Sequence, residues 1–221
     1  MITTALTVTA AVSALLAIAA DWEERRHRSF LALKPLTTLL LIGVAASIAY
    51  TGPYAQCVLL ALALSLFGDV FLMLDARDRV GDGARASDRA FIAGLASFLL
   101  AHVAFVVAFA QGLQAPGLPA WLAAVVLYAG GLLFVLLPRA GALKVPVLIY
   151  CLVLGAMVFA AAARHQAFND GDSLRALLGA LLFMGSDSLL GWRRFVGRYR
   201  GAQALILSTY WGAIGLIAWS V

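Results

Sequence analysis

The stretch ALALSLFGDVFLMLD, residues 61–75, is an apolar helical sequence with one carboxylate, Asp69, set inside it. A second stretch, LLFMGSDSLLGW at residues 181–192, places Asp187 in the same way. A carboxylate surrounded by hydrocarbon is costly, so it persists only where it is paired, protonated or facing a polar cavity. We therefore expect the rest of the chain to bring these two aspartates to one chamber.

The composition is that of an integral membrane protein. Hydrophobic residues make up 63% of the chain and charged residues 12%, whereas a soluble domain has about 45–50% and about 25%. The formal charge of +5 does not indicate nucleic acid binding, because the basic residues sit in short loops beside apolar runs. Cys57 and Cys151 fall inside apolar runs, so we expect small buried hydrophobic side chains rather than a disulfide or a metal pair.

Eight apolar runs, each near the ~20 residues that a bilayer crossing requires, predict an all-α fold of eight transmembrane helices in one polytopic membrane domain. The first run is kept as a span because its arginines follow it, which is the wrong polarity for a cleaved signal. The domain covers residues 1–221, and the predicted spans are roughly 3–20, 31–50, 54–74, 90–110, 120–137, 143–163, 174–192 and 202–220.

The basic residues predict the orientation of the spans. All but two of the 16 Lys and Arg residues lie at odd-numbered connections, and the exceptions are Arg164 and Arg175. Positively charged loops face the cytoplasm. We therefore expect a multi-pass protein of the cell inner membrane with both termini on the non-cytoplasmic side. The odd-numbered connections carry Arg25, Arg26, Arg28, Lys34, Arg77, Arg79, Arg85, Arg89, Arg139, Lys144, Arg193, Arg194, Arg198 and Arg200.

A weak internal repeat predicts two parallel four-helix halves, since an even number of spans preserves orientation. Chance similarity between Leu- and Ala-rich helices is the alternative. The matched pairs are Lys34 with Lys144, Asp69 with Asp187, and His102 with Tyr210.

Several polar side chains are predicted to lie at similar depths within their spans, where they form a candidate site. Asp69 and Asp187 each lie six residues from the charged residue that ends their span, about 9 Å inside the same face. The other candidates could instead have structural roles: the lysine could extend to the membrane surface, the aromatic rings could serve packing, the serines could bond neighbouring helices, and the histidine could be hydrogen-bonded in the core. The other candidates are Lys34, His102, Tyr150, Ser186, Ser188, Tyr210 and Arg193.

Two carboxyl groups in one apolar chamber do not both ionise easily, so one acts as an acid and the other as a base. Such a pair can hydrolyse an ether-type bond through an oxocarbenium-like state, or relay protons in a transporter. The three histidines are far apart and show no zinc spacing, so we expect no metal and no cofactor. The residues alone leave both chemistries open.

Six stretches, in order, resemble the YhhN family of eight-span membrane proteins, whose animal members are lysoplasmalogenases. The resemblance covers nearly the whole chain. The stretches are KPLTT (34–38), SLFGDVFLML (65–74), FIAGLASFLLAHVAFVVAF (91–109), YCLVLGAM (150–157), GALLFMGSDSLLGWRRF (179–195) and ILSTYWGAIGLIAWS (206–220).

The resemblance implies hydrolysis of the vinyl ether bond of a lysoplasmalogen, giving a fatty aldehyde and a glycerophospho-alcohol. One of Asp69 and Asp187 would be the acid and the other the base. Tyr150, Tyr210 and His102 would orient water or glycerol oxygens, and Lys34 and Arg193 would hold the phosphate. The alternatives are a proton-coupled transporter or lipid carrier, a lipid-binding protein without chemistry, and a hydrolase of another lysolipid.

Overall fold

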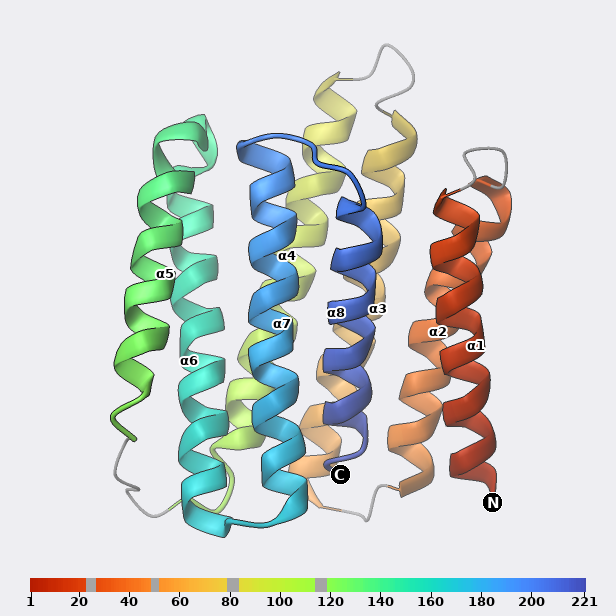
Figure 1. Cartoon of the computed structure of the whole chain (residues 1–221), viewed down its shortest axis with the longest axis vertical. Helices are drawn as coiled ribbons and strands as arrows, with labels where there is room; N and C mark the ends of the chain where they lie inside the picture. The colour runs from red at the N-terminus through yellow and green to blue at the C-terminus, as the bar shows by residue number, and fades with distance from the viewer. Residues whose placement is uncertain (23–26, 49–51, 79–83, 114–118) are drawn as a thin grey trace.

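The computed structural model describes residues 1–22, 27–48, 52–78, 84–113 and 119–221. Within these ranges eight α-helices run alternately up and down in one bundle, as Figure 1 shows. The predicted all-α fold is confirmed. The helices are α1 (Ile2–Trp22), α2 (His27–Ile48), α3 (Pro53–Asp78), α4 (Ala84–Phe109), α5 (Leu122–Leu136), α6 (Lys144–Phe168), α7 (Gly171–Phe195) and α8 (Ala202–Ala218), with the short 3₁₀ turns η2 (Leu137–Arg139) and η3 (Gly141–Leu143) between α5 and α6.

The helices match the lengths expected of membrane spans. Among the described residues seven are long and apolar enough to cross a bilayer, and α8 is a shorter apolar helix. The helices α3 and α6 extend four or five residues past the C-terminal ends of their predicted spans, because no Gly or Pro interrupts the sequence that follows the apolar run. Helix α4 begins six residues before its predicted span. The fold is that of a multi-pass membrane protein.

Side chains are distributed as a lipid solvent requires. On α5, Leu127 is 76% exposed and Phe134 is 82% exposed. Inside the bundle Lys34, Asp69 and His102 are buried. Apolar atoms outside and polar groups inside are the arrangement in which hydrocarbon meets only hydrocarbon.

Glycines allow two of the helix pairs to pack closely. A Cβ on Gly68 of α3 would lie 2.6 Å from the Phe98 ring of α4. At the other pair, a Cβ on Gly179 of α7 would lie 2.8 Å from the carbonyl oxygen of Ala213 in α8. Small residues at such crossings let helices approach where no hydrophobic effect drives them together.

Both chain termini lie at one end of the bundle, at the bottom of Figure 1, and the C-terminal ends of α1, α3, α5 and α7 lie at the other end. Among the described residues, that second end carries Arg139, Arg193 and Arg194. Arg25, Arg26 and Arg79 lie outside the described residues.

Candidate active site

Asp69 is the centre of a buried polar cluster made by three helices. It is 1% exposed. Its Oδ1 lies 3.1 Å from the Nζ of Lys34, and its Oδ2 accepts hydrogen bonds of 2.8 Å from Thr38 and from Tyr210. An ammonium and two hydroxyl donors satisfy the oxygens of this carboxylate.

Asp187 has a different set of partners. The hydroxyl of Tyr150 donates to its Oδ2 over 2.6 Å, and the Nε2 of His102 lies 3.5 Å from the same oxygen. His102 is fully buried, and neither of its ring nitrogens has a hydrogen-bond partner among the described residues. Buried nitrogens of this kind are where a water or a substrate atom is expected to bind.

Aromatic rings connect the two carboxyl clusters. The Tyr210 ring meets Phe98 and Phe183 edge-on, with centroids 5.8 and 5.5 Å apart. The His102 ring in turn meets Phe183 at 4.7 Å and Tyr150 at 5.2 Å. These contacts form a continuous series of packed rings from Tyr210 through Phe183 and His102 to Tyr150.

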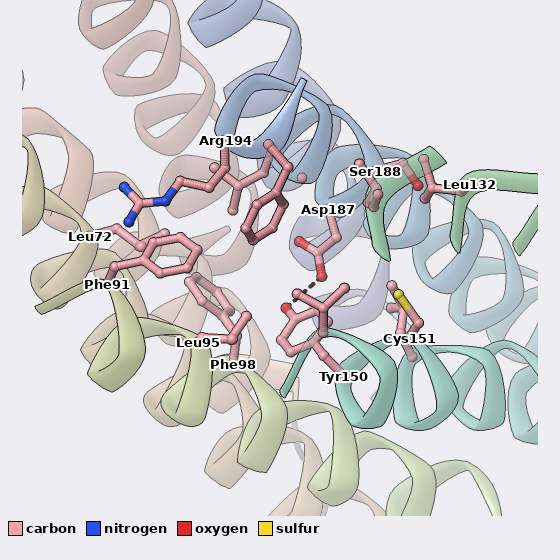
Figure 2. A pocket seen from close by; sticks show the side chains of 16 residues that line it. Leu72, Phe91, Leu95, Phe98, Leu132, Tyr150, Cys151, Asp187, Ser188 and Arg194 are labelled. Carbon is pink, nitrogen blue, oxygen red and sulfur yellow. Dashed lines mark hydrogen bonds between the residues drawn. The ribbon is translucent and has the colours of Figure 1, made fainter. Parts of the chain in front are cut away.

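A narrow cavity opens beside Asp187 between α3, α4, α5, α6 and α7, with a free volume of about 60 Å³. Figure 2 shows the carboxyl group and the Tyr150 hydroxyl inside it. A bound lipid would have to displace some of the apolar side chains of the wall. The lining residues are Leu72, Phe91, Leu95, Phe98, Leu132, Leu136, Val147, Tyr150, Cys151, Leu154, Asp187, Ser188, Leu190, Gly191, Arg194 and Phe195.

Asp69 does not line this cavity. Asp69 accepts a hydrogen bond from the Tyr210 hydroxyl, and the Tyr210 ring packs against the Phe98 ring, which forms part of the cavity wall. Of the two carboxyl groups, Asp187 alone lines this cavity. That one chamber holds both carboxyl groups stays a prediction.

The remaining predicted residues lie at different places. Ser186 donates to the carbonyl of Ile206 and joins α7 to α8. Ser188 donates to the carbonyl of Met184 in its own helix and lines the cavity. Arg193 donates to the side chain of Gln203 near the start of α8 and does not line the cavity.

Three side chains at the candidate site were not predicted from the sequence. Thr38 shares a helix face with Lys34 because it lies four residues later, and that spacing could have found it. Arg194 lines the cavity where Arg193 was expected to serve. Phe98 forms the boundary between the two clusters, and nothing in an apolar helix distinguishes it from its neighbours.

Each of the two carboxyl groups has one partner from its own predicted four-helix half, α1–α4 or α5–α8, and one from the other half. Asp69 is contacted from the second helix of its own half, through Lys34, and from the last helix of the other half, through Tyr210. Asp187 is likewise contacted by Tyr150 of α6 and by His102 of α4.

No group of three or more His, Cys, Asp or Glu side chains that could hold a metal ion occurs in the part of the chain that the structure describes.

Residues 29–221 match the sequence profile of the YhhN family. The chain belongs to this family. The family resemblance drawn from the six stretches is thereby confirmed.

Relatives of this chain carry enzyme names. Lysoplasmalogenase TMEM86B of Homo sapiens is 34% identical over 189 residues, which cover 85% of this chain and 73% of that protein. Lysoplasmalogenase TMEM86A of Bos taurus is 29% identical and is covered over 72% of its length. A lysoplasmalogenase of Mycobacterium tuberculosis is 33% identical over 128 residues, 55% of this chain and 46% of that protein. No solved structure matches the chain.

Proposed function

We propose that this YhhN protein hydrolyses the vinyl ether bond of lysoplasmalogens, releasing a fatty aldehyde and a glycerophospho-alcohol. The observation that carries the proposal is the carboxyl group of Asp187 on the wall of an apolar cavity, with the Tyr150 hydroxyl and the His102 ring beside it. The names of the human, bovine and mycobacterial relatives support the same reaction.

The reaction needs an acid that can give a proton to carbon. Protonation of the outer vinyl carbon leaves an oxocarbenium ion at the carbon bonded to oxygen, and water then adds to that carbon. We assign the proton donor to Asp187, because its contacts are a neutral phenol and an imidazole. After the transfer its carboxylate stands beside the new cation and stabilises it.

Asp69 is unsuited to the same step. Its carboxylate is paired with the ammonium group of Lys34 and lies outside the cavity. In this proposal Asp69 is a positioning residue, because its hydrogen bond fixes the Tyr210 hydroxyl and thereby the ring that packs on Phe98 and Phe183. This assignment departs from the expectation that both aspartates act directly on the substrate.

His102 is the group available to activate water. Its Nε2 would accept a proton from the water that attacks the oxocarbenium carbon. The resulting hemiacetal collapses when its hydroxyl proton returns to Asp187 and the imidazolium protonates the departing glycerol oxygen. Acid and base are then restored, and the net change is the addition of one water.

The proposed orientation places the arginine-rich end of the bundle at the cytoplasmic face of the inner membrane. Both termini then lie on the opposite side. Arg194, which lines the cavity near the C-terminal end of α7, then lies toward the cytoplasmic side.

The test is product analysis with purified protein. A vinyl-ether lysophospholipid and the ester lysophospholipid of the same chain length are incubated separately, and aldehyde and fatty acid are measured by mass spectrometry. We expect aldehyde from the vinyl ether and no fatty acid from the ester. Fatty acid from the ester would make the protein a lysophospholipase, and the absence of both products would refute hydrolysis.

A further inference from the structure

Two adjacent arginines at the end of α7 point to different surroundings. The guanidinium of Arg194 lies over the ring of Phe91, 4.1 Å from its centroid, and the residue lines the Asp187 cavity. Arg193 donates to Gln203 and lines a separate hollow on the side of α8. The difference follows from the helix, since each residue turns the side chain by about 100°.

Arg194 and Asp187 share one wall of the cavity. They are seven residues apart in α7, which is two turns and about 10.5 Å along the axis. Figure 2 shows the Asp187 carboxyl group further in, next to Tyr150, and the Arg194 guanidinium beside Phe91. An acid inside an apolar cavity and a cation farther along its wall suit a lipid with an apolar chain and an anionic head.

The spacing also suits the proposed substrate. Seven covalent bonds separate the outer vinyl carbon of a lysoplasmalogen from its phosphorus. At the roughly 1.2 Å that an extended chain gains per bond, these bonds span about 8 Å. A proton donor at one end and a cation at the other, each adding a contact distance, can therefore engage the same molecule.

We propose that Arg194 binds the phosphate of the substrate and makes the phosphate a requirement for efficient turnover. The inference rests on the proposed function and adds its specificity determinant. A guanidinium offers two parallel N–H donors to phosphate oxygens. Phe91 holds its plane in place, and Phe195 packs edge-on against Phe91 with centroids 6.4 Å apart.

The experiment compares two vinyl ethers that differ only in the phosphate: a lysoplasmalogen and the 1-alkenylglycerol with the same chain. Aldehyde release is measured for wild type, Arg194→Gln, Arg194→Lys and, as the matched control, Arg193→Gln. For wild type we expect a lower KM with the lysoplasmalogen. Arg194→Gln should raise that KM by roughly 10- to 100-fold, as expected for losing a charged hydrogen bond, and leave kinetics on the alkenylglycerol unchanged.

The control variants sharpen the result. Arg194→Lys keeps the charge without the paired donors and should fall between wild type and Arg194→Gln, while Arg193→Gln should resemble wild type. Equal KM values of wild type for the two substrates would overturn the assignment without reference to any variant. An equal loss on both substrates in Arg194→Gln, or the same KM effect in Arg193→Gln, would also overturn it. If wild type cleaves neither vinyl ether, the proposed function itself fails.

Discussion

Asp69 and Asp187 are the same residue type, yet their side chains have different hydrogen-bond partners. Asp69 is enclosed by an ammonium and two hydroxyl donors. Asp187 meets one hydroxyl and one imidazole at the edge of a cavity. The partners of each carboxyl group come from the preceding helix and from one farther away in the chain, and they set the chemistry that is open to the group.

The buried Lys34–Asp69 pair is predicted to couple strongly in stability measurements. Removing one partner leaves an uncompensated charge inside the bundle, so Lys34→Met or Asp69→Asn should each cost about 3–5 kcal/mol. The double variant should be more stable than either single variant, because neither charge is then left alone. Unfolding in detergent, followed by circular dichroism, measures these values.

The exposed pair between Asp172 and Arg175 provides the control, since both side chains are about half exposed. Asp172→Asn should change stability by about 0–1 kcal/mol. Additive losses from Lys34→Met and Asp69→Asn would argue against a coupled pair.

At the scale of the helices, the α3–α4 crossing controls the shape of the site. A methyl group on Gly68 would lie 2.6 Å from the Phe98 ring, which is enclosed by Phe183 and Tyr210. Gly68→Ala should cost about 1–3 kcal/mol by overpacking and should reduce aldehyde release, because the displaced ring moves toward the cavity. Gly155→Ala in α6 meets nothing within 4 Å and should retain wild-type activity. Equal behaviour of the two variants would show that the crossing has room.

The start of α7 is fixed by a capping box outside the membrane-spanning segment. Asp170 accepts a 2.8 Å hydrogen bond from the backbone N–H of Ser173, whose hydroxyl accepts from the N–H of Asp170. Hydrogen bonding of the Asp170 carboxylate by Ser173, with the backbone N–H the larger cause and the side chain the smaller, lowers the pKa of Asp170. The cap therefore stabilises the helix above the unfolded pKa near 4 and loses its effect as the pH falls through the lower folded pKa.

Replacing the cap tests this pH dependence. Asp170→Ala should cost about 1 kcal/mol at neutral pH. Asp170→Asn keeps an acceptor at every pH, so thermal stability of wild type relative to Asp170→Asn should decline only below about pH 4. A difference that changes between pH 5 and 7 would point to another group.

For the whole molecule, the positive-inside pattern predicts which end of the bundle is cytoplasmic. In a protein with Cys57 and Cys151 replaced by serine, single cysteines at Ala142 and Asp172 mark opposite ends. A membrane-impermeant maleimide applied to intact cells should label Asp172→Cys at once and Ala142→Cys only after permeabilisation. The reverse pattern would invert the proposed orientation.

The fold could be predicted from the sequence because each bilayer crossing requires a long apolar run. The eight helices are therefore close to their predicted spans. Asp69 and Asp187 could also be identified from the sequence, because a charged residue inside an apolar run is easily recognised. The position of Phe98 between the two clusters could not be predicted, and neither could the fact that Arg194 rather than Arg193 lines the cavity. Both depend on how the helices rotate and pack. The internal repeat stays a prediction, supported by the way Asp69 and Asp187 each draw a partner from the other half.

The most direct test of the account is aldehyde release from a vinyl-ether lysophospholipid by wild type and Asp187→Asn, both purified and checked for unchanged thermal stability. Asparagine keeps the shape of the side chain and a hydrogen-bond acceptor for Tyr150 but has no carboxyl proton to give. The account predicts that aldehyde release falls by roughly 10²- to 10⁴-fold, the contribution of a positioned general acid. A folded Asp187→Asn protein that releases aldehyde at the wild-type rate would contradict it.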